Sequence, residues 1–345
     1  MHGYGTRVAV VAAMAALMVP LSVGRASADP AVPQARDLVG VGAQTTQALL
    51  NRFAADYNAS LGSDTTSPRL YSWDATGTSP IITKGGATPI VRPDGAVAGI
   101  KALAATTGET VDFARSDRGP KAKDPYGLDF VVFAKDAVTW SATRTGNAPA
   151  QLTPAQLNAI YSCTTVTWNQ ISSSLPATAI KPVLPQADSG TRSFFLSAIG
   201  NPTLGGCVTT GPEENEGTDP SLGDPNVVFP YSVGHYLGQT VGNHGTATDA
   251  PGNLTLRNVV IGSSTLTPVT NNQIDPNFAN TLFGRMLYNV FRDAEWTATD
   301  AHGTAIQNVF GPSGWICNDP TAAADLASYG FLAAPAVACG SATLS

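Results

Sequence analysis

The stretch that decides the fold is DLVGVGAQTTQALLNRFAADYN, residues 37–58. Its first part, 37–43, is a short apolar run ending in glycines, which predicts a buried strand. Thr45 and Thr46 lie where the N-cap of a following helix belongs. A set of apolar residues then recurs at the spacing of one helix face: Leu49, Leu50, Phe53, Ala54 and Tyr57. A strand, a glycine-rich turn and a helix make an α/β unit, whose strand end usually faces a ligand.

The same alternation continues along the chain. Strands are predicted within 110–120, 128–140, 180–186, 227–239, 253–262 and 284–293, and helices within 89–105, 152–162, 189–200, 227–239 and 319–331. The strand at 253–262 is expected to cross back to an earlier part of the fold. Residues 201–226 are rich in glycine, proline and acidic residues and predict a solvated surface loop. Strands that alternate with helices predict the α/β class.

Residues 1–28 have the pattern of a secretory signal peptide. Arg7 precedes an apolar run, and Ala26-Ser27-Ala28 matches a cleavage signature. The run is too short for a convincing membrane span. No cysteine lies near the cleavage position, so a lipid anchor is not indicated. The mature chain is therefore expected to be exported, and either freely secreted or retained at the cell by a feature that the sequence does not show.

Length and charge narrow the class of protein further. Residues 29–345 are enough for two lobes, each with its own core. The formal net charge is −6, and removing Arg7 and Arg25 with the leader makes it more negative. A net acidic chain argues against non-specific binding to nucleic acid or anionic membranes, which needs basic patches. A small anion stays possible as a ligand, because a few local donors outweigh a distant field.

The four cysteines predict two disulfides, as an even number does in an exported protein. Three pairings are possible. The pairing Cys163–Cys207 with Cys317–Cys339 is favoured because each bond closes a local loop. A zinc site would need ligand spacings that the chain lacks, so no metal is expected.

Three junctions between a loop and a helix carry small hydrogen-bond donors: residues 44–46, 94–96 and 189–192. Backbone amides at a helix start are unpaired and attract anions. A plain N-cap explains each junction alone, whereas several converging junctions would form an oxyanion site. A fourth loop offers Asp117 between Arg115 and Arg118, and this carboxylate could equally be a loop residue paired with either arginine.

Four blocks of sequence resemble the phosphate-binding proteins of bacterial ABC transporters. They are GVGAQTTQALLNRFAADYN (40–58), VDFARSDRGP (111–120), LTPAQLNAIYSCTTVTWNQI (152–171) and PQADSGTRSFF (185–195), and their order and separations also match. The resemblance implies a type II periplasmic-binding-protein fold, in which two α/β lobes joined by crossing strands close on one oxyanion. Lobe one is expected to comprise residues 36–127 and 255–345, and lobe two residues 128–254.

The resemblance also implies the ligand-binding residues. They are Gln44, Thr45, Thr46, Gly95, Ala96, Asp117, Ser189, Gly190 and Thr191, with Arg192 either neutralising the anion or lying on the helix surface. An ionised carboxylate such as Asp117 can only accept a hydrogen bond. It therefore favours phosphate, which carries a proton near neutral pH, over sulfate, which carries none.

The chain departs from the family pattern at three positions. Ala96 stands where the family often has serine, and Asp188 lies where an additional glycine is common. Gln186 stands where some members have arginine. An acidic side chain near the pocket would oppose a divalent anion, so these departures bear on how well phosphate fits.

The function expected from the sequence is that of a monomeric solute-binding protein without a cofactor. It would bind phosphate or a similar oxyanion, deliver it to the membrane subunits of an ABC transporter, and catalyse nothing. One alternative is a secreted, phosphatase-like enzyme, which would need a metal cluster or an activated nucleophile. The other is a ligand-free adhesive or signalling module on the same fold. Neither G-x-S-x-G nor H-E-x-x-H occurs in the chain.

Overall fold

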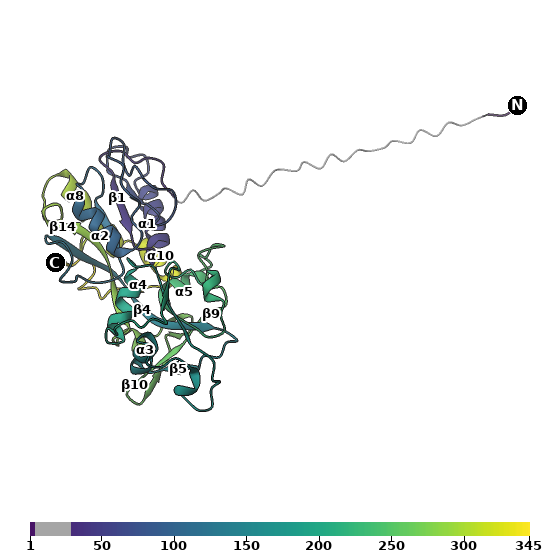
Figure 1. Ribbon diagram of the computed structural model, residues 1–345. Coiled ribbons are helices and arrows are strands. Elements are labelled where there is room, and N and C mark those ends of the chain that lie inside the picture. Colours follow the sequence, from purple (N-terminus) through teal and green to yellow (C-terminus); the bar gives the residue numbers. More distant parts are fainter. Residues whose placement is uncertain (4–28) are drawn as a thin grey trace.

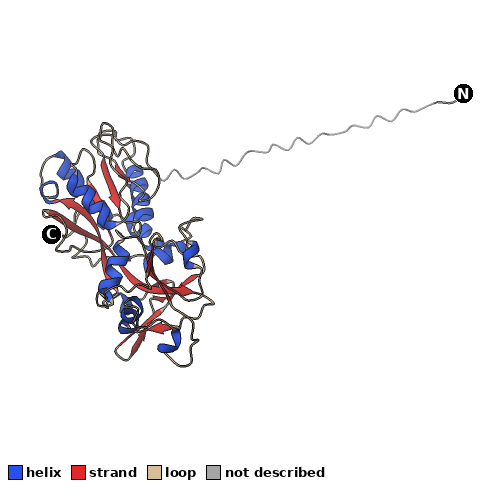
Figure 2. Ribbon diagram, viewed as in Figure 1, coloured by secondary structure: helices blue, strands red, loops and turns tan. Residues whose placement is uncertain are grey.

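The computed structural model describes residues 1–3 and 29–345 (Figure 1). The predicted signal peptide, apart from residues 1–3, lies outside the described residues. Helices and strands alternate along the described chain, which confirms the α/β class (Figure 2). None of the helices described is long and apolar enough to cross a membrane.

The elements have the following bounds. The helices are α1 (Gln47–Ser60), α2 (Ala96–Ala105), α3 (Pro154–Tyr161), α4 (Gly190–Ala198), α5 (Val233–Thr240), α6 (Pro276–Ala279), α7 (Asp293–Trp296), α8 (Ala301–Phe310), α9 (Trp315–Asn318) and α10 (Pro320–Ser328), with 3₁₀ turns at Trp168–Gln170 and Pro220–Leu222. The strands are β1 (Leu38–Gly42), β2 (Leu70–Ser72), β3 (Phe113–Ser116), β4 (Leu128–Thr143), β5 (Gln151–Leu152), β6 (Lys181–Leu184), β7 (Thr209–Thr210), β8 (Val227–Ser232), β9 (Leu254–Leu256), β10 (Asn258–Ile261), β11 (Ser264–Leu266), β12 (Val269–Thr270), β13 (Gln273–Ile274), β14 (Gly284–Arg292), β15 (Leu332–Ala333) and β16 (Ala342–Leu344).

Two long strands hold the main sheet together. The first part of β4, residues 128–137, pairs antiparallel with β14, and its last part, 138–143, pairs with β8 and β9. β14 also pairs with β3, within the order β2-β1-β3-β14-β4-β8-β6-β7. The returning strand is therefore β14. The prediction that residues 253–262 cross back is wrong, because they form β9 and β10, which pair with the end of β4 and with β5.

Two lobes lie at the two ends of this sheet (Figure 1). Lobe one contains β1–β3, α1, α2 and α8, and lobe two contains β5, β6, β8 and α3–α5. Each lobe has its own buried cluster, one including Phe113 and the other including Trp140. The lobe boundaries given by the sequence remain a prediction. The packing of Val259 and Phe278 into the cluster of lobe two favours a second boundary near residue 283.

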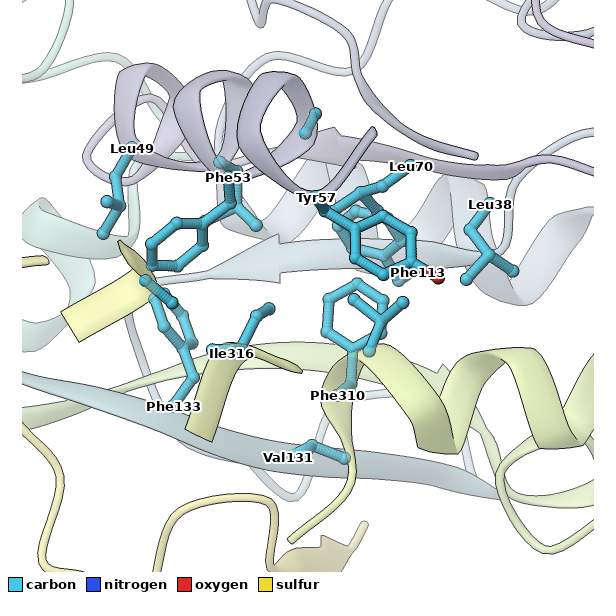
Figure 3. Packing of buried hydrophobic residues seen from close by; sticks show 14 of the residues in the cluster. Leu38, Leu49, Phe53, Tyr57, Leu70, Phe113, Val131, Phe133, Phe310 and Ile316 are labelled. Carbon is cyan, nitrogen blue, oxygen red and sulfur yellow. The ribbon is translucent and has the colours of Figure 1, made fainter. Parts of the chain in front are cut away.

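The core of lobe one fixes α1 against the sheet (Figure 3). The predicted apolar face of α1, residues 49, 50, 53, 54 and 57, is buried. Phe53 packs edge-on against Phe133 of β4, with ring centroids 6.4 Å apart. The ring centroids of Phe113 in β3 and Phe310 in α8 are 4.9 Å apart. Aromatic burial of this kind dominates core energetics, so the start of α1 is held firmly beside the ends of β1 and β3.

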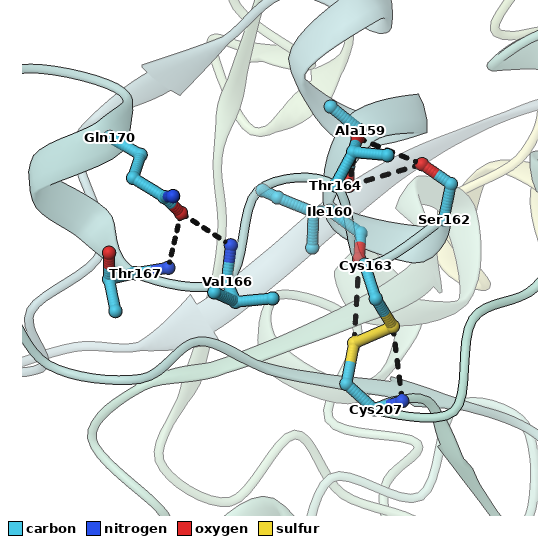
Figure 4. The surroundings of a disulfide bond; sticks show 9 residues. All are labelled: Ala159, Ile160, Ser162, Cys163, Thr164, Val166, Thr167, Gln170 and Cys207. Atoms are coloured by element: carbon cyan, nitrogen blue, oxygen red, sulfur yellow. Dashed lines mark hydrogen bonds between the residues drawn. A yellow bond between two sulfur atoms is a disulfide. The ribbon is translucent and has the colours of Figure 1, made fainter.

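The predicted disulfide pairing is confirmed. Cys163 bonds Cys207 and Cys317 bonds Cys339, with Cα–Cα distances of 6.0 and 5.8 Å. Figure 4 shows Cys163 just after the end of α3, where the Cys207 amide also donates to its Sγ over 3.0 Å. The first bond joins α3 to the segment that follows α4, and the second joins α9 to the segment before β16.

Removing either disulfide is expected to lower the free energy of unfolding. The bonds span 44 and 22 residues, so loop-closure entropy predicts a loss of about 3–4 kcal/mol for each. The double variant Cys163→Ala, Cys207→Ala should lose about 0.6 kcal/mol more than Cys317→Ala, Cys339→Ala, because doubling the loop adds that much. Urea unfolding without reductant measures both losses. Variants that unfold at the wild-type urea concentration would contradict the expectation.

Candidate functional site

The first predicted junction, residues 44–46, lies between β1 and α1. Thr46 is the N-cap residue as predicted, but its side chain makes no capping hydrogen bond. Its Oγ1 is buried without a hydrogen-bond partner among the described residues. The Thr45 hydroxyl instead donates to Oδ2 of Asp117 over 2.7 Å. The start of α1 therefore directs a polar side chain across to the end of β3.

The second junction brings α2 of lobe one against lobe two. Gly95 has a φ of 89°, and a Cβ there would lie 2.5 Å from the carbonyl oxygen of Asp188, so glycine is required. The Val97 amide donates to the same carbonyl over 3.2 Å. Ala96 is fully buried, and its Cβ lies 3.1 Å from the position of a Cβ on Gly190. An amide at the start of α2 thus bonds the other lobe directly.

The third junction is the start of α4. Ser189 caps this helix, as the N-cap interpretation predicts, by accepting a hydrogen bond from an amide of the first turn. The same hydroxyl donates to a carboxylate oxygen of Glu214. The Thr191 hydroxyl donates to Oδ2 of Asp117 over 3.0 Å. A Cβ on Gly190 would lie 1.6 Å from Oδ1 of Asp117, so only glycine permits this close approach.

Asp117 is fully buried at the end of β3. Its partner is Arg285 of β14, whose Nη1 donates to Oδ2 over 3.1 Å. The alternative that it pairs with Arg115 or Arg118 is wrong. Arg115 donates to the main-chain carbonyls of residues 42 and 43, and Arg118 pairs with Asp124. Oδ1 of Asp117 is buried and has no hydrogen-bond partner among the described residues.

Arg285 joins two buried carboxylates. Its Nη2 and Nε donate to Oδ2 of Asp136 over 2.8 and 3.0 Å, while Nη1 reaches Asp117. Burial alone would lower the pKa of Arg285, but the charges of Asp117 and Asp136 outweigh it and raise the pKa. Asp136 also accepts from the Gly234 amide at the start of α5 over 2.9 Å. The guanidinium therefore stays charged and links both lobes.

The largest correction concerns residues 201–226, because the prediction of a solvated surface loop fails at Glu214. This residue is 1% exposed. Its Oε1 accepts from the Gln44 amide over 3.2 Å. Its Oε2 accepts from the Ser189 hydroxyl and from the Thr191 amide, the latter over 3.2 Å. A buried carboxylate is tolerated where donors surround it, and here helix starts of both lobes supply them. We call Thr45, Asp117, Ser189, Thr191, Glu214 and Arg285 the interlobe cluster.

Two neighbouring glutamates at this cluster, Glu213 and Glu214, have raised pKa values. Burial, and secondly the charge of Asp117, raise the pKa of Glu214 to about 7. Burial, and secondly the charge of Asp94, raise the pKa of Glu213 to about 7. Glu213 accepts from Nε2 of Gln44 over 2.7 Å. Small changes of pH around 7 therefore change the charge between the lobes.

Two residues that the sequence places near the ligand point elsewhere. The guanidinium of Arg192 donates to the carbonyl of Pro185 over 3.0 Å, so it does not join the cluster. The carboxylate of Asp188 is partly exposed and lies 3.7 Å from Lys101. Neither side chain contributes charge to the donors around Glu214.

Three residues of the site were missed by reasoning from the sequence: Arg285, Glu214 and Asn215. Arg285 lies near the start of β14, next to the apolar pair Met286 and Leu287, and a charged residue at a buried strand position indicates a buried partner. Asn215 donates from Nδ2 to the Thr45 hydroxyl over 3.0 Å. Nothing in the acidic stretch distinguishes Glu214 from its neighbours Glu213 and Glu216.

Two α/β lobes joined by crossing strands, with donor-bearing helix starts facing each other between them, define the two-lobe architecture of solute-binding proteins. The chain belongs to the PBP superfamily, whose domain matches residues 30–228. Among curated relatives, the phosphate-binding protein PstS of Staphylococcus epidermidis is 32% identical over 85 residues, which are 24% of this chain and 26% of the relative. The chain therefore spans about a quarter of the length of the curated relatives it matches.

Solved structures share the fold over most of the chain. A Clostridium perfringens protein assigned as a phosphate ABC transporter substrate-binding protein, with bound phosphate, is 16% identical with a TM-score of 0.57, covering 87% of this chain and 100% of that one. An ABC-type phosphate transport receptor from Vibrio cholerae is 15% identical with a TM-score of 0.57, covering 86% and 100%. At sequence identities this low, the structural similarity shows a shared fold.

Proposed function

We propose that this chain is an exported solute-binding protein that holds phosphate, or a closely related oxyanion, between its lobes and delivers it to the membrane subunits of an ABC transporter. One observation carries the proposal. Hydroxyls from the starts of α1 and α4 both occupy Oδ2 of Asp117, while Oδ1 is buried and unpartnered among the described residues. An acceptor in this position favours an anion that brings its own proton.

The surrounding donors suit an oxyanion. The amides of Gln44 and Thr191 and the hydroxyl of Ser189 already hold a carboxylate, which presents charged oxygens as phosphate does. Helix starts favour such groups because their amides are unpaired and carry partial positive charge. The relatives described above are named for phosphate, which supports phosphate as the anion.

We propose further that the protein performs no covalent chemistry. Ser189 is fully buried, and its hydroxyl oxygen accepts from the Arg192 amide as the cap of α4 while its proton bonds Glu214, so this hydroxyl is engaged as a helix cap. The buried His235 is engaged elsewhere, with Nδ1 3.0 Å from the Thr45 carbonyl oxygen and Nε2 2.6 Å from Asp249. These contacts favour a binding role for the cluster over a phosphatase-like one.

Calorimetric titration of ligand-stripped mature protein tests the proposal. Phosphate is expected to bind more tightly than sulfate, and a chromogenic phosphoester should not be hydrolysed. Thr191→Val is expected to weaken phosphate binding by about 10–100-fold, because it removes the hydroxyl that holds Oδ2 of Asp117 in place, and a buried hydrogen bond to a charged group contributes about 1.5–3 kcal/mol. Thr240→Val is the matched control, since its hydroxyl bonds only a carbonyl of its own helix.

Each contrary outcome favours a different alternative. Turnover of the phosphoester would support the phosphatase-like enzyme. Absence of heat with either anion, in the wild type and in the Glu214→Ala variant described below, would support a ligand-free module on this fold.

A further inference from the structure

Glu214 occupies the donors that an oxyanion would use. Its two carboxylate oxygens take hydrogen bonds from Gln44 at the start of α1 and from Ser189 and Thr191 at the start of α4. These donors come from both lobes, and they are the ones to which the proposed function assigns phosphate. Two negatively charged acceptors cannot share the same amides and hydroxyl. The bound anion and the Glu214 side chain therefore exclude each other.

The segment 213–215 is anchored in this position by its own contacts. The Glu214 amide donates to Oε1 of Gln186 over 3.0 Å. On either side, Glu213 bonds the side chain of Gln44 and Asn215 bonds the Thr45 hydroxyl. Asn215 has a φ of 64°, a backbone conformation that asparagine tolerates better than most residues. The insertion of Glu214 is thus supported by contacts on each side of it.

The charges around Glu214 make its position sensitive to pH. The charged groups that face it are Asp117 at the end of β3, Arg285 of β14, His235 of α5 and the neighbouring Glu213, and Glu216 and Asp249 line the same small cavity. Burial and the charge of Asp117 raise the pKa of inserted Glu214 to about 7, whereas in water it would return to the ordinary glutamate range. The inserted state binds its proton more tightly, so acidification stabilises insertion. Raising the pH through about 7 favours release.

We propose that Glu214 is a built-in competitor of the oxyanion, and that phosphate binds only after residues 213–215 leave the interlobe cluster. The inference rests on the proposed function, because a competitor needs a ligand to exclude. It accounts for an acidic side chain at the donors of an anion site, which a receptor for phosphate would otherwise avoid. It also assigns Gln186 a role, since this residue holds the amide of Glu214 in place.

The decisive experiment compares phosphate titrations of the wild type, Glu214→Ala and Asp219→Asn at pH 7. Removing the competitor should tighten phosphate binding at least about tenfold if the inserted state holds nine-tenths of the population or more. Asp219→Asn also removes a charge from this loop, but Asp219 accepts from the amide and hydroxyl of Ser221, so this variant should bind like the wild type. Thermal melting of each variant confirms that it is folded.

The pH dependence gives a second readout. The ratio of the Glu214→Ala affinity to the wild-type affinity is expected to fall about tenfold between pH 6 and pH 8, as the inserted carboxylate loses its proton. Taking the ratio cancels the ionisation of phosphate itself. Should the alanine variant not fold, Glu214→Gln replaces it, because it keeps an uncharged acceptor in place. It should lose the part of the pH dependence that comes from Glu214 and keep any part that comes from Glu213.

The outcomes separate the two proposals. Equal phosphate affinity in the wild type and Glu214→Ala, or the same pH dependence in the wild type and Glu214→Gln, overturns the competitor and leaves the proposed function standing. Absence of phosphate binding in both the wild type and Glu214→Ala overturns the proposed function, and the competitor with it. Tighter binding by Glu214→Ala supports both.

Discussion

Replacing Asp117 with asparagine is expected to lower the ratio of phosphate affinity to sulfate affinity by about 10⁴-fold, the discrimination reached where a buried polar group would be left unpaired. Three donors, Thr45, Thr191 and Arg285, engage Oδ2. The asparagine oxygen should therefore take the place of Oδ2 and its amide nitrogen the place of Oδ1. The group that we propose to accept the proton of phosphate then becomes a donor, which sulfate can use. Titration with both anions at pH 7 measures the ratio.

The matched control for this substitution is Asp300→Asn. Asp300 caps α8 by accepting from the Gly303 amide over 2.8 Å, and asparagine caps a helix about as well as aspartate. This variant should keep the wild-type ratio of affinities. An Asp117→Asn protein that still prefers phosphate by the wild-type factor would show that Asp117 does not select the protonated anion.

The local units of the fold could be predicted because a few neighbouring residues encode them. The apolar periodicity of residues 49–57 gives both the existence of α1 and its buried face. Thr153 begins α3 with a capping box, in which Thr153 and Gln156 exchange hydrogen bonds of 3.1 and 2.8 Å. The crossing strand β14 was harder to predict from the sequence, because its pairing with both β3 and β4 depends on partners far away in the chain.

The site was predictable at the helix starts and at Asp117, which the family resemblance implies. Thr45, Ser189 and Thr191 lie in short motifs that start helices, whereas Arg285 reaches Asp117 across 168 residues. Glu214 reaches Gln44 across 170 residues. An acidic loop is expected in water because burying a carboxylate is unfavourable. Amides from two helix starts offset that penalty, but nothing in the sequence of the loop indicates that these donors are nearby.

Replacing Arg285 with methionine is expected to lower the free energy of unfolding at pH 7 by about 3–5 kcal/mol, because removing one partner of a buried ion pair leaves an uncompensated charge. Here two carboxylates, Asp117 and Asp136, would lose their only cation within 4 Å among the described residues. Arg285→Lys keeps the charge but not the planar fork that bonds both acids, so its loss should be smaller. Urea unfolding followed by tryptophan fluorescence measures the two variants.

Arg52 is the control that separates the effect of burial from the effect of losing an arginine between two carboxylates. It also lies between two carboxylates, 2.8 Å from Asp56 and 3.3 Å from Asp325, but half of its side chain is exposed. Exposed ion pairs contribute about 0.2–1 kcal/mol, so Arg52→Met should lose no more than about 1 kcal/mol. If Arg285→Met is as stable as Arg52→Met, the buried acids do not depend on this cation. If it is less stable by the expected margin, Arg285 holds together the strand that joins the lobes and the carboxylate that we propose to face the ligand.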